Sequence, residues 1–160
     1  MPVPKQKPGR SKQDYQTPEA FLIALTRKLD IGNFKTDLAA SHDNAVAGFY
    51  FTEEEDSLKQ DWTSLPPGWA FLNPPFSDIE PWVKKAWESR PAKIAILIPA
   101  SVGSNWWRDW VHLKCQVLFL NGRLAFIPDQ PHALYPKDCA LLLYSQNHEV
   151  GYRIWTWKEQ

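Results

Sequence analysis

Short, continuous apolar runs recur along the chain. Residues 69–72, 94–98 and 140–144 contain no charged side chain. Runs of this length without polar–apolar alternation are typical of strands that are buried on both faces of a sheet. Further runs rich in apolar residues predict strands at 34–38, 46–51, 117–120, 124–127 and 152–157.

Helical spacing predicts three helices. The first begins at Thr17-Pro18-Glu19, with Thr17 as its cap and Pro18 at its first position, and ends at 30–33. The second follows residues 77–80, whose S-x-x-E pattern is a capping box. The apolar faces of the three helices are formed, in chain order, by Phe21, Leu22, Leu25 and Leu29; by Trp82, Val83, Ala86 and Trp87; and by Trp106, Trp107, Trp110 and Val111.

The order of these elements predicts the fold class. Strands that alternate with helices favour an α/β fold, with a mostly parallel sheet covered on both faces. The strand-rich end of the chain predicts antiparallel additions at one edge of this sheet. We expect one domain over residues 15–160. Residues 1–14 are basic and rich in proline, which predicts a flexible tail; solubilisation and phosphate contact both remain open as its role.

Composition excludes several classes of protein. The 18 basic and 18 acidic side chains balance, which excludes a histone-like protein that binds by bulk charge. No apolar run reaches the roughly 18 residues that span a bilayer, and no apolar segment follows the basic start as in a secretory signal. We therefore expect a soluble, cytoplasmic protein. The two cysteines and four histidines lack metal-ligand spacing, and no nucleophilic triad or glycine-rich phosphate loop is present, so we expect neither a metal site nor a hydrolase or kinase.

The tetrapeptide Asn73-Pro74-Pro75-Phe76 carries the chemical information. It follows a predicted buried strand, and open α/β sheets bind their ligands at such strand ends. Two prolines fix the backbone and push Asn73 toward an extended conformation. The Asn73 side-chain oxygen and the Pro74 carbonyl can accept both N–H bonds of an exocyclic amine, while Phe76 stacks on its ring. Alternatively, Asn-Pro-Pro ends the strand and Ser77 caps the next helix.

In this setting the tetrapeptide resembles the amine-binding motif of S-adenosylmethionine-dependent amino-methyltransferases. The wider pattern resembles the phage-type DNA N6-adenine methyltransferases, the phage Dam family, over roughly residues 15–145. The segments that carry the resemblance are Tyr15-Gln16-Thr17-Pro18, 37–41 with Asn44-Ala45, Leu58 with Trp62, 72–77 with 82–86, 98–100 and 122–126.

The resemblance implies a Rossmann-like class I methyltransferase fold with an antiparallel C-terminal hairpin and S-adenosylmethionine as cofactor. It implies a flipped adenine in DNA as the target, held by Asn73, Pro74, Pro75 and Phe76. It also implies a set of cofactor-binding residues: Tyr15, Thr17 and Pro18; Asp37, Leu38, Ala39 and Ser41 with the backbone at Ala40; and Asp56 with Leu58. Asp37 would hold the methionine ammonium group of the cofactor, and Asp56 and Leu58 would lie near its adenine ring. The chain departs from the broader superfamily after the first strand, where Asp37-Leu38-Ala39-Ala40-Ser41 replaces the usual glycine-rich turn.

Several other residues have two open interpretations. The acidic run 53–56 is either a solvated loop or a source of one ribose contact, and Trp106, Trp107 and Trp110 are either packed or face a flipped base. Lys84 and Lys85 are either solvated or bind phosphate, and His132 is either a loop residue or reads the target sequence.

These observations predict a methyltransferase that acts on the N6 amine of adenine in DNA, in the cytoplasm of a bacterial host cell. Cytosine N4, an RNA base amine or a protein glutamine remain alternative acceptors. An inactive nucleic-acid-binding module is the alternative from another class. Because 160 residues leave little room for a recognition domain, target recognition falls to residues 101–114 and 128–138, to the tail, or to the second subunit of a homodimer.

Overall fold

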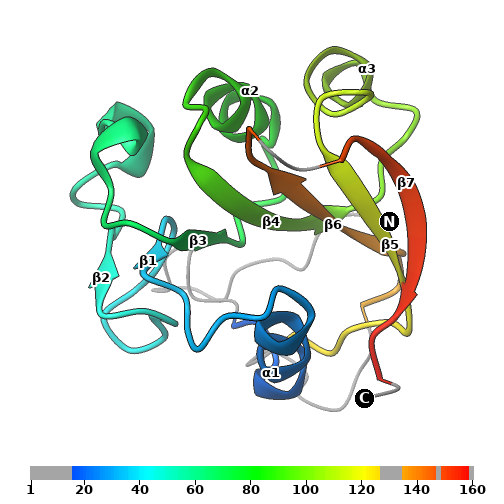
Figure 1. The fold of residues 1–160 in the computed structure, drawn as a ribbon, viewed down its shortest axis with the longest axis horizontal. Helices are drawn as coiled ribbons and strands as arrows, with labels where there is room; N and C mark the ends of the chain where they lie inside the picture. Colours follow the sequence, from blue (N-terminus) through cyan, green and yellow to red (C-terminus); the bar gives the residue numbers. More distant parts are fainter. Residues whose placement is uncertain (1–15, 127–134, 147–148, 159–160) are drawn as a thin grey trace.

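Two long apolar strands, at Lys93–Pro99 and Cys139–Tyr144, lie side by side in the middle of the sheet (Figure 1). The computed structural model describes residues 16–126, 135–146 and 149–158. In this part of the chain seven strands form one sheet in the order β2-β1-β3-β4-β6-β5-β7. The strands are β1 (Thr36–Asp37), β2 (Phe49–Tyr50), β3 (Trp69–Leu72), β4 (Lys93–Pro99), β5 (Gln116–Asn121), β6 (Cys139–Tyr144) and β7 (Gly151–Thr156).

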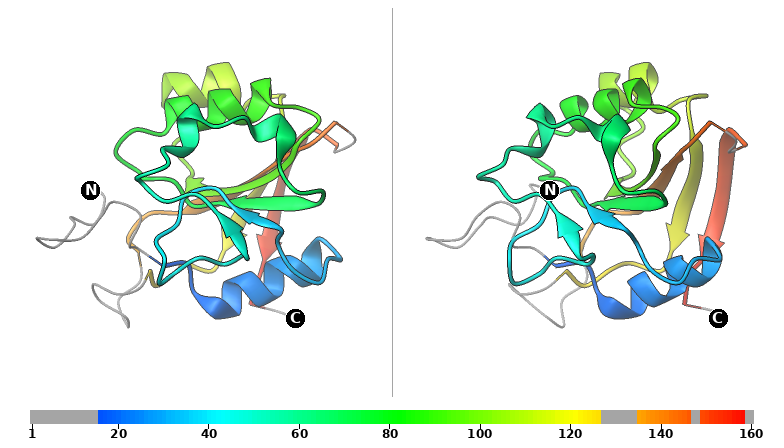
Figure 2. Two further views of the ribbon diagram at one scale, coloured as in Figure 1. Left: turned by 90° about the vertical axis from the view of Figure 1, so that its left-hand side faces the viewer. Right: turned by 60° about the vertical axis from the view of Figure 1, so that its left-hand side comes forward.

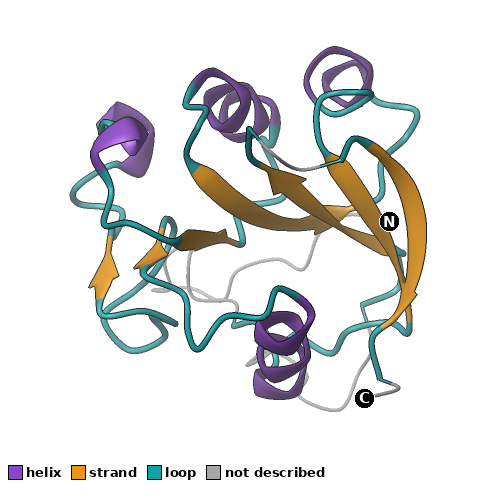
Figure 3. Ribbon diagram, in the orientation of Figure 1, coloured by secondary structure: helices purple, strands orange, loops and turns teal. Residues whose placement is uncertain are grey.

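Helices cover both faces of the sheet. Helix α1 (Glu19–Lys28) lies on one face, and α2 (Glu80–Glu88) and α3 (Asn105–Trp110) lie on the other, together with the 3-10 turns η1 (Ser57–Lys59) and η2 (Trp62–Ser64). The turned views of Figure 2 and the colouring of Figure 3 show the same three layers. The α/β class and the mostly parallel sheet with two covered faces are therefore confirmed.

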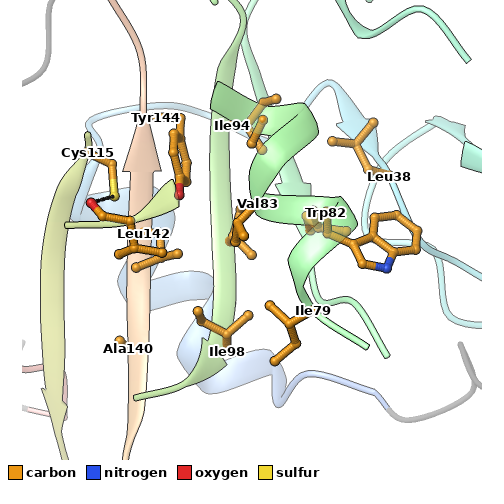
Figure 4. Packing of buried hydrophobic residues seen from close by; sticks show 14 of the residues in the cluster. Leu38, Ile79, Trp82, Val83, Ile94, Ile98, Cys115, Ala140, Leu142 and Tyr144 are labelled. Atoms are coloured by element: carbon orange, nitrogen blue, oxygen red, sulfur yellow. Dashed lines mark hydrogen bonds between the residues drawn. The ribbon is translucent and has the colours of Figure 1, made fainter. Parts of the chain in front are cut away.

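The two faces of the central strands explain the continuous apolar runs. In β4, Ile94, Ile96 and Ile98 pack against α2 and α3, whereas Ala95 and Leu97 belong to the cluster that contains α1. Strand β6 divides its side chains between the same two clusters. Figure 4 shows the first cluster, with the α2 residues Trp82 and Val83 lying against the sheet. A polar side chain on either face would lose its water contacts, so neither β4 nor β6 alternates polar with apolar residues.

The antiparallel strand lies inside the sheet and not at its edge. Strand β6 is antiparallel to both neighbours, β4 and β5, whereas the edge strand β7 is parallel to β5. The expected antiparallel additions on one side of the parallel strands are therefore confirmed, but the last strand, β7, is parallel to its neighbour β5 and does not pair with β6 in a final hairpin. In the sheet, β5 lies between β6 and β7.

Local element ends also differ from the prediction. The N-cap of α1 is Pro18, and the N-cap of α2 is Ile79; neither helix has a side-chain cap hydrogen bond, so Thr17 and Ser77 do not cap. The first two strands contain two residues each and are shorter than the apolar runs around them. Residues 124–126 form no strand. The predicted basic tail lies outside the described residues, and the single domain over 15–160 stays a prediction.

The packing of α1 gives the first test of the fold. Phe21 is fully buried, with its ring centroid 5.3 Å from that of Trp157 and 5.8 Å from that of Trp155. We expect Phe21→Ala to lower the free energy of unfolding by about 3–5 kcal/mol, because a large buried side chain leaves a cavity. Ile23, 45% exposed on the same helix, is the control, and Ile23→Ala should cost less than about 1 kcal/mol. Urea titration measures both; equal effects would contradict this packing.

Candidate active site

The carboxyl ends of β1 and β3 meet at one edge of the sheet. The two strands pair in parallel, with Asp37 opposite Phe71, so that Asp37 ends β1 just where Asn73 follows β3. From β1 the chain continues to β2 on one side, and from β3 it continues to β4 on the other. Ligands of open α/β sheets bind at such a topological switch point. The structure therefore brings Asp37 and Asn73 to the edge where a ligand is expected.

The side chain of Asn73 is oriented by a hydrogen bond from a distant segment. Its Nδ2 donates to Oγ1 of Thr17 at 3.0 Å, across a separation of 56 residues. Within the described part of the chain, Oδ1 has no hydrogen-bond partner, and Asn73 is half-buried. Pro74 is buried and has no N–H, so the backbone after Asn73 cannot compete for this oxygen. The carboxamide thus offers a free acceptor.

Phe76 lies among two other aromatic rings. Its ring centroid is 5.8 Å from that of Phe126 and 5.7 Å from that of Tyr135, and these two are 5.6 Å apart. Phe126 was not predicted as a site residue, and Tyr135 was included only through residues 128–138, a range expected to contribute to target recognition. Phe126 belongs to a segment that carried the family resemblance, which was the available signal. Tyr135 belongs to no periodic pattern, so only the fold reveals that it packs against Phe76.

Asp37 is a buried carboxyl group that fixes the loop after β1. It is 4% exposed, and its Oδ1 accepts from the backbone N–H of Ala39 at 3.2 Å, while Oδ2 accepts from that of Val46 at 3.0 Å. Burial raises its pKa to about 6, although both hydrogen bonds act in the opposite direction. No cationic side chain of the described residues pairs with it. The carboxylate is therefore positioned at the site without a counter-charge.

The loop after β1 does not need glycine. Leu38, Ala39 and Ala40 are buried, and no residue from 38 to 46 has a positive φ. Instead, the N–H of Ser41 donates to Oδ1 of Asn44 at 2.7 Å, and the N–H of Ala40 donates to the carbonyl of Phe51 at 2.9 Å. A turn without left-handed residues tolerates alanine, which explains how the chain departs from a glycine-rich pattern.

Comparison with known proteins identifies the family of the chain. A family profile described as DNA N-6-adenine-methyltransferase (Dam) matches residues 5–159. The chain belongs to this family. The DNA N-6-adenine-methyltransferase of Escherichia phage T1 is 26% identical in an alignment 151 residues long. The match covers 79% of this chain and 63% of the relative. The chain thus spans somewhat less than two thirds of that relative's length.

Two of the residues that the Dam resemblance implied, Asp56 and Leu58, have contacts of their own in the loop after β2. Asp56 has a left-handed φ of 54°, and its carboxylate is 3.7 Å from Lys59 Nζ. The carbonyl of Leu58 accepts from Nζ of Lys85 at 3.0 Å. Leu58 packs against the cluster that contains Leu38 and Ala39, whereas no hydrogen bond among the described residues joins the Asp56 side chain to Asp37 or Asn73. Tyr15 lies outside the described residues, as does His132.

Several ambiguous side chains of this Dam family member have packing roles. Trp107 is buried, stacks on Phe119 and donates from Nε1 to Oη of Tyr152 at 3.2 Å. Lys84 lies over the ring of Trp110, and Lys85 lies over that of Trp62. In the acidic run, Glu55 accepts from the backbone N–H and the hydroxyl of Thr52 and so closes its own turn.

Two general features complete the description. No helix in the described ranges is long and apolar enough to cross a membrane. Within the same ranges, no three His, Cys, Asp or Glu side chains gather as a metal site would require. Cys115 and Cys139 are buried, and burial raises the pKa of both thiols to about 12.

The pKa of Asp37 predicts a pH-dependent stability. The ordinary pKa of the group is 3.8 and the folded value is about 6. As the pH rises, Asp37 loses its proton first in the unfolded chain and only later in the folded one. Its contribution to the free energy of unfolding, on the order of 3 kcal/mol, is therefore fully present below pH 4 and is lost as the pH rises through about 6. The free energy of unfolding of the wild type, minus that of Asp37→Asn, should fall between pH 4 and 7 in urea titrations. Asp43→Asn, at an exposed position of the same loop, should follow the wild-type profile; a constant difference for Asp37→Asn would contradict the prediction.

The hydroxyl of Tyr135 gives a second stability test. Oη is buried and has no hydrogen-bond partner among the described residues, and burial raises the pKa of Tyr135 to about 12. Because an unpaired buried hydroxyl is costly, Tyr135→Phe should raise the free energy of unfolding by about 1 kcal/mol. Tyr152 is the control, since its Oη has partners at 3.2 Å on Trp107 and 2.8 Å on His112. Tyr152→Phe should lower stability by about the same amount. Thermal unfolding distinguishes the two, and destabilisation by Tyr135→Phe would show that its hydroxyl has a partner.

Proposed function

We propose that this chain transfers a methyl group from S-adenosylmethionine to the N6 amine of adenine in DNA. The observation that carries the proposal is the Asn73 carboxamide, whose Nδ2 is bound by Thr17 and whose Oδ1 is a free acceptor at the switch point of the sheet. Membership of the Dam family and the phage T1 relative support the reaction and the acceptor.

The residues at the end of β1 fit the proposed cofactor. Each oxygen of the Asp37 carboxylate accepts one backbone N–H and keeps a lone pair, so it can also accept from an ammonium group. Such a cation would provide the missing counter-charge. Thr17 and Pro18 precede α1 at the same edge, and Leu38, Ala39 and Ser41 line the turn; we assign all of these to the cofactor site, with Tyr15, Asp56 and Leu58. When bound, S-adenosylmethionine supplies a methyl group activated by a sulfonium.

The sheet supports the finer fold assignment. A parallel core, helices on both faces and one antiparallel strand inserted near one side are compatible with a Rossmann-like class I methyltransferase. We therefore extend the family assignment to this fold, with β1 and β2 as the cofactor side and β3 and β4 as the target side.

The proposed mechanism relies on positioning. Adenine must leave the duplex, because its amine is otherwise paired and stacked. Asn73 Oδ1 and the Pro74 carbonyl then accept its two N–H bonds, which draws the nitrogen toward tetrahedral geometry, and Phe76 stacks on the base for about 1–3 kcal/mol. With the cofactor bound, these residues would hold the amine nitrogen for attack on the methyl carbon; the bonding pair would remain on sulfur and one amine proton would pass to water. No side-chain nucleophile is needed, because the residues act by positioning.

The remaining assignments follow from this reaction. We place the enzyme in the cytoplasm of a bacterial host cell, because the matched relative is a phage protein. We keep a homodimer as one source of recognition surface, besides the loop at residues 101–104 that follows β4 at the target side.

Removal of the Asn73 carboxamide tests the function. We expect Asn73→Ala to reduce methyl transfer to unmethylated duplex DNA at least about 100-fold, since an acceptor for the reacting amine is lost. The cofactor dissociation constant should change less than about twofold. Asn33→Ala, at an exposed position after α1, is the control and should retain wild-type turnover. Radiolabelled transfer followed by nucleoside mass spectrometry measures the product.

Other outcomes of this assay separate the alternatives. Near-wild-type turnover of Asn73→Ala would contradict the mechanism. Methylated RNA with unmodified DNA would move the acceptor to an RNA base amine, and N4-methylcytosine would move it to cytosine. Cofactor binding without methylation of either nucleic acid would favour a protein glutamine. Failure to bind the cofactor would favour an inactive nucleic-acid-binding module.

A further inference from the structure

Thr17 has an unusual position for a residue that precedes a helix. Threonine before the first turn normally accepts a backbone N–H of that turn through its hydroxyl. Helix α1 has no side-chain cap hydrogen bond, and its N-cap is Pro18. The Thr17 hydroxyl instead accepts from Nδ2 of Asn73 at 3.0 Å. The helix thus lacks a cap that its sequence could provide, and the hydroxyl contacts the candidate acceptor of the target amine.

The Asn73 side chain needs this kind of support. The last torsion of an asparagine is broad and roughly two-fold, so the oxygen and nitrogen ends of the amide readily exchange places. Only the oxygen end accepts from an amine; the nitrogen end would present a second donor. Pro74 restricts the backbone of Asn73 but not this torsion. The hydrogen bond between Nδ2 and the Thr17 hydroxyl restricts this torsion, and in the orientation that the structure shows, Oδ1 is the end without a partner among the described residues.

We propose that Thr17 is a positioning residue for methyl transfer, which orients the Asn73 carboxamide so that Oδ1 faces the target amine. This inference rests on the proposed function and assigns the hydroxyl of Thr17 to Asn73, so that the proposed cofactor contact of Thr17 is left to its backbone and methyl group, which Thr17→Val keeps. It also makes the start of α1 part of the target site. The side chain acts through Asn73 and does not touch the reacting atoms.

Two substitutions at position 17 separate the hydroxyl from the methyl group. Thr17→Val keeps the shape and removes the hydroxyl, whereas Thr17→Ser keeps the hydroxyl. Thr26 on α1 offers a matched control, because its exposed Oγ1 donates to the Ile23 carbonyl at 3.0 Å. Thr26→Val therefore removes a side-chain hydrogen bond from the same helix without affecting Asn73. Turnover is measured at saturating cofactor and DNA, and the cofactor dissociation constant is measured by calorimetry.

We expect Thr17→Val to lower kcat about 10- to 100-fold, since a freely rotating amide is misplaced for much of the time. The cofactor dissociation constant should stay within about twofold, Thr17→Ser should recover kcat to within about threefold, and Thr26→Val should match the wild type. Unchanged kcat in Thr17→Val would overturn the proposal. So would a weaker cofactor affinity that explains the whole loss, or a Thr17→Ser variant as slow as Thr17→Val.

A spectroscopic measurement keeps this proposal separate from the proposed function. The two Nδ2 proton signals of Asn73 are assigned by their absence in Asn73→Ala. In the wild type and in Thr17→Ser one of them should exchange slowly with solvent, and in Thr17→Val both should exchange at least tenfold faster. If the wild type methylates no DNA, the proposed function fails, and this exchange pattern still decides whether Thr17 orients Asn73. Equal exchange in wild type and Thr17→Val would overturn the orientation itself.

Discussion

The parallel pairing of β1 with β3 is the constraint on which the candidate site depends. Two residues of β1 are enough to set the register that brings the end of this strand beside Asn73. The pair is short, and the carboxylate at its end reinforces it: Asp37 accepts N–H bonds from both Ala39 and Val46 and so fixes the following loop. A buried carboxylate is costly, and its position is typical of groups retained for binding rather than for stability.

The elements that the sequence predicted correctly are those whose burial is decided locally. Residues 69–72, 94–98 and 140–144 are apolar throughout because both faces of the sheet are covered, and all three runs lie within strands. The Asn-Pro-Pro-Phe motif was likewise found at a strand end, since prolines restrict their own backbone whatever the rest of the chain does.

Where prediction failed, a distant contact outweighed a local preference. Thr17 matched a helix cap, but its hydroxyl is bound to a residue 56 positions away. The place of β6 between β4 and β5 depends on a comparison of alternative pairings that no single window of sequence contains. Two further contacts arise only after the sheet has formed: the packing of Tyr135 against Phe76 and the hydrogen bond from Val46 to Asp37. The donor of this hydrogen bond is a backbone N–H, which every residue type but proline supplies, so the side chain of Val46 gives no signal for it.

The interior place of β6 has a consequence for how the chain is made. Strands β4 and β5 leave the ribosome first, yet they are joined only by a strand that follows both. Until residues 139–144 emerge, one edge of β4 has unpaired backbone N–H and C=O groups, and the side chains of this strand are mostly isoleucine and leucine. Such an edge is a template for pairing with other chains. Such late, non-local pairing is slow. The nascent protein therefore passes through a stage in which one edge of β4 is unpaired, and fast closure by β6 matters for solubility as well as for the finished fold.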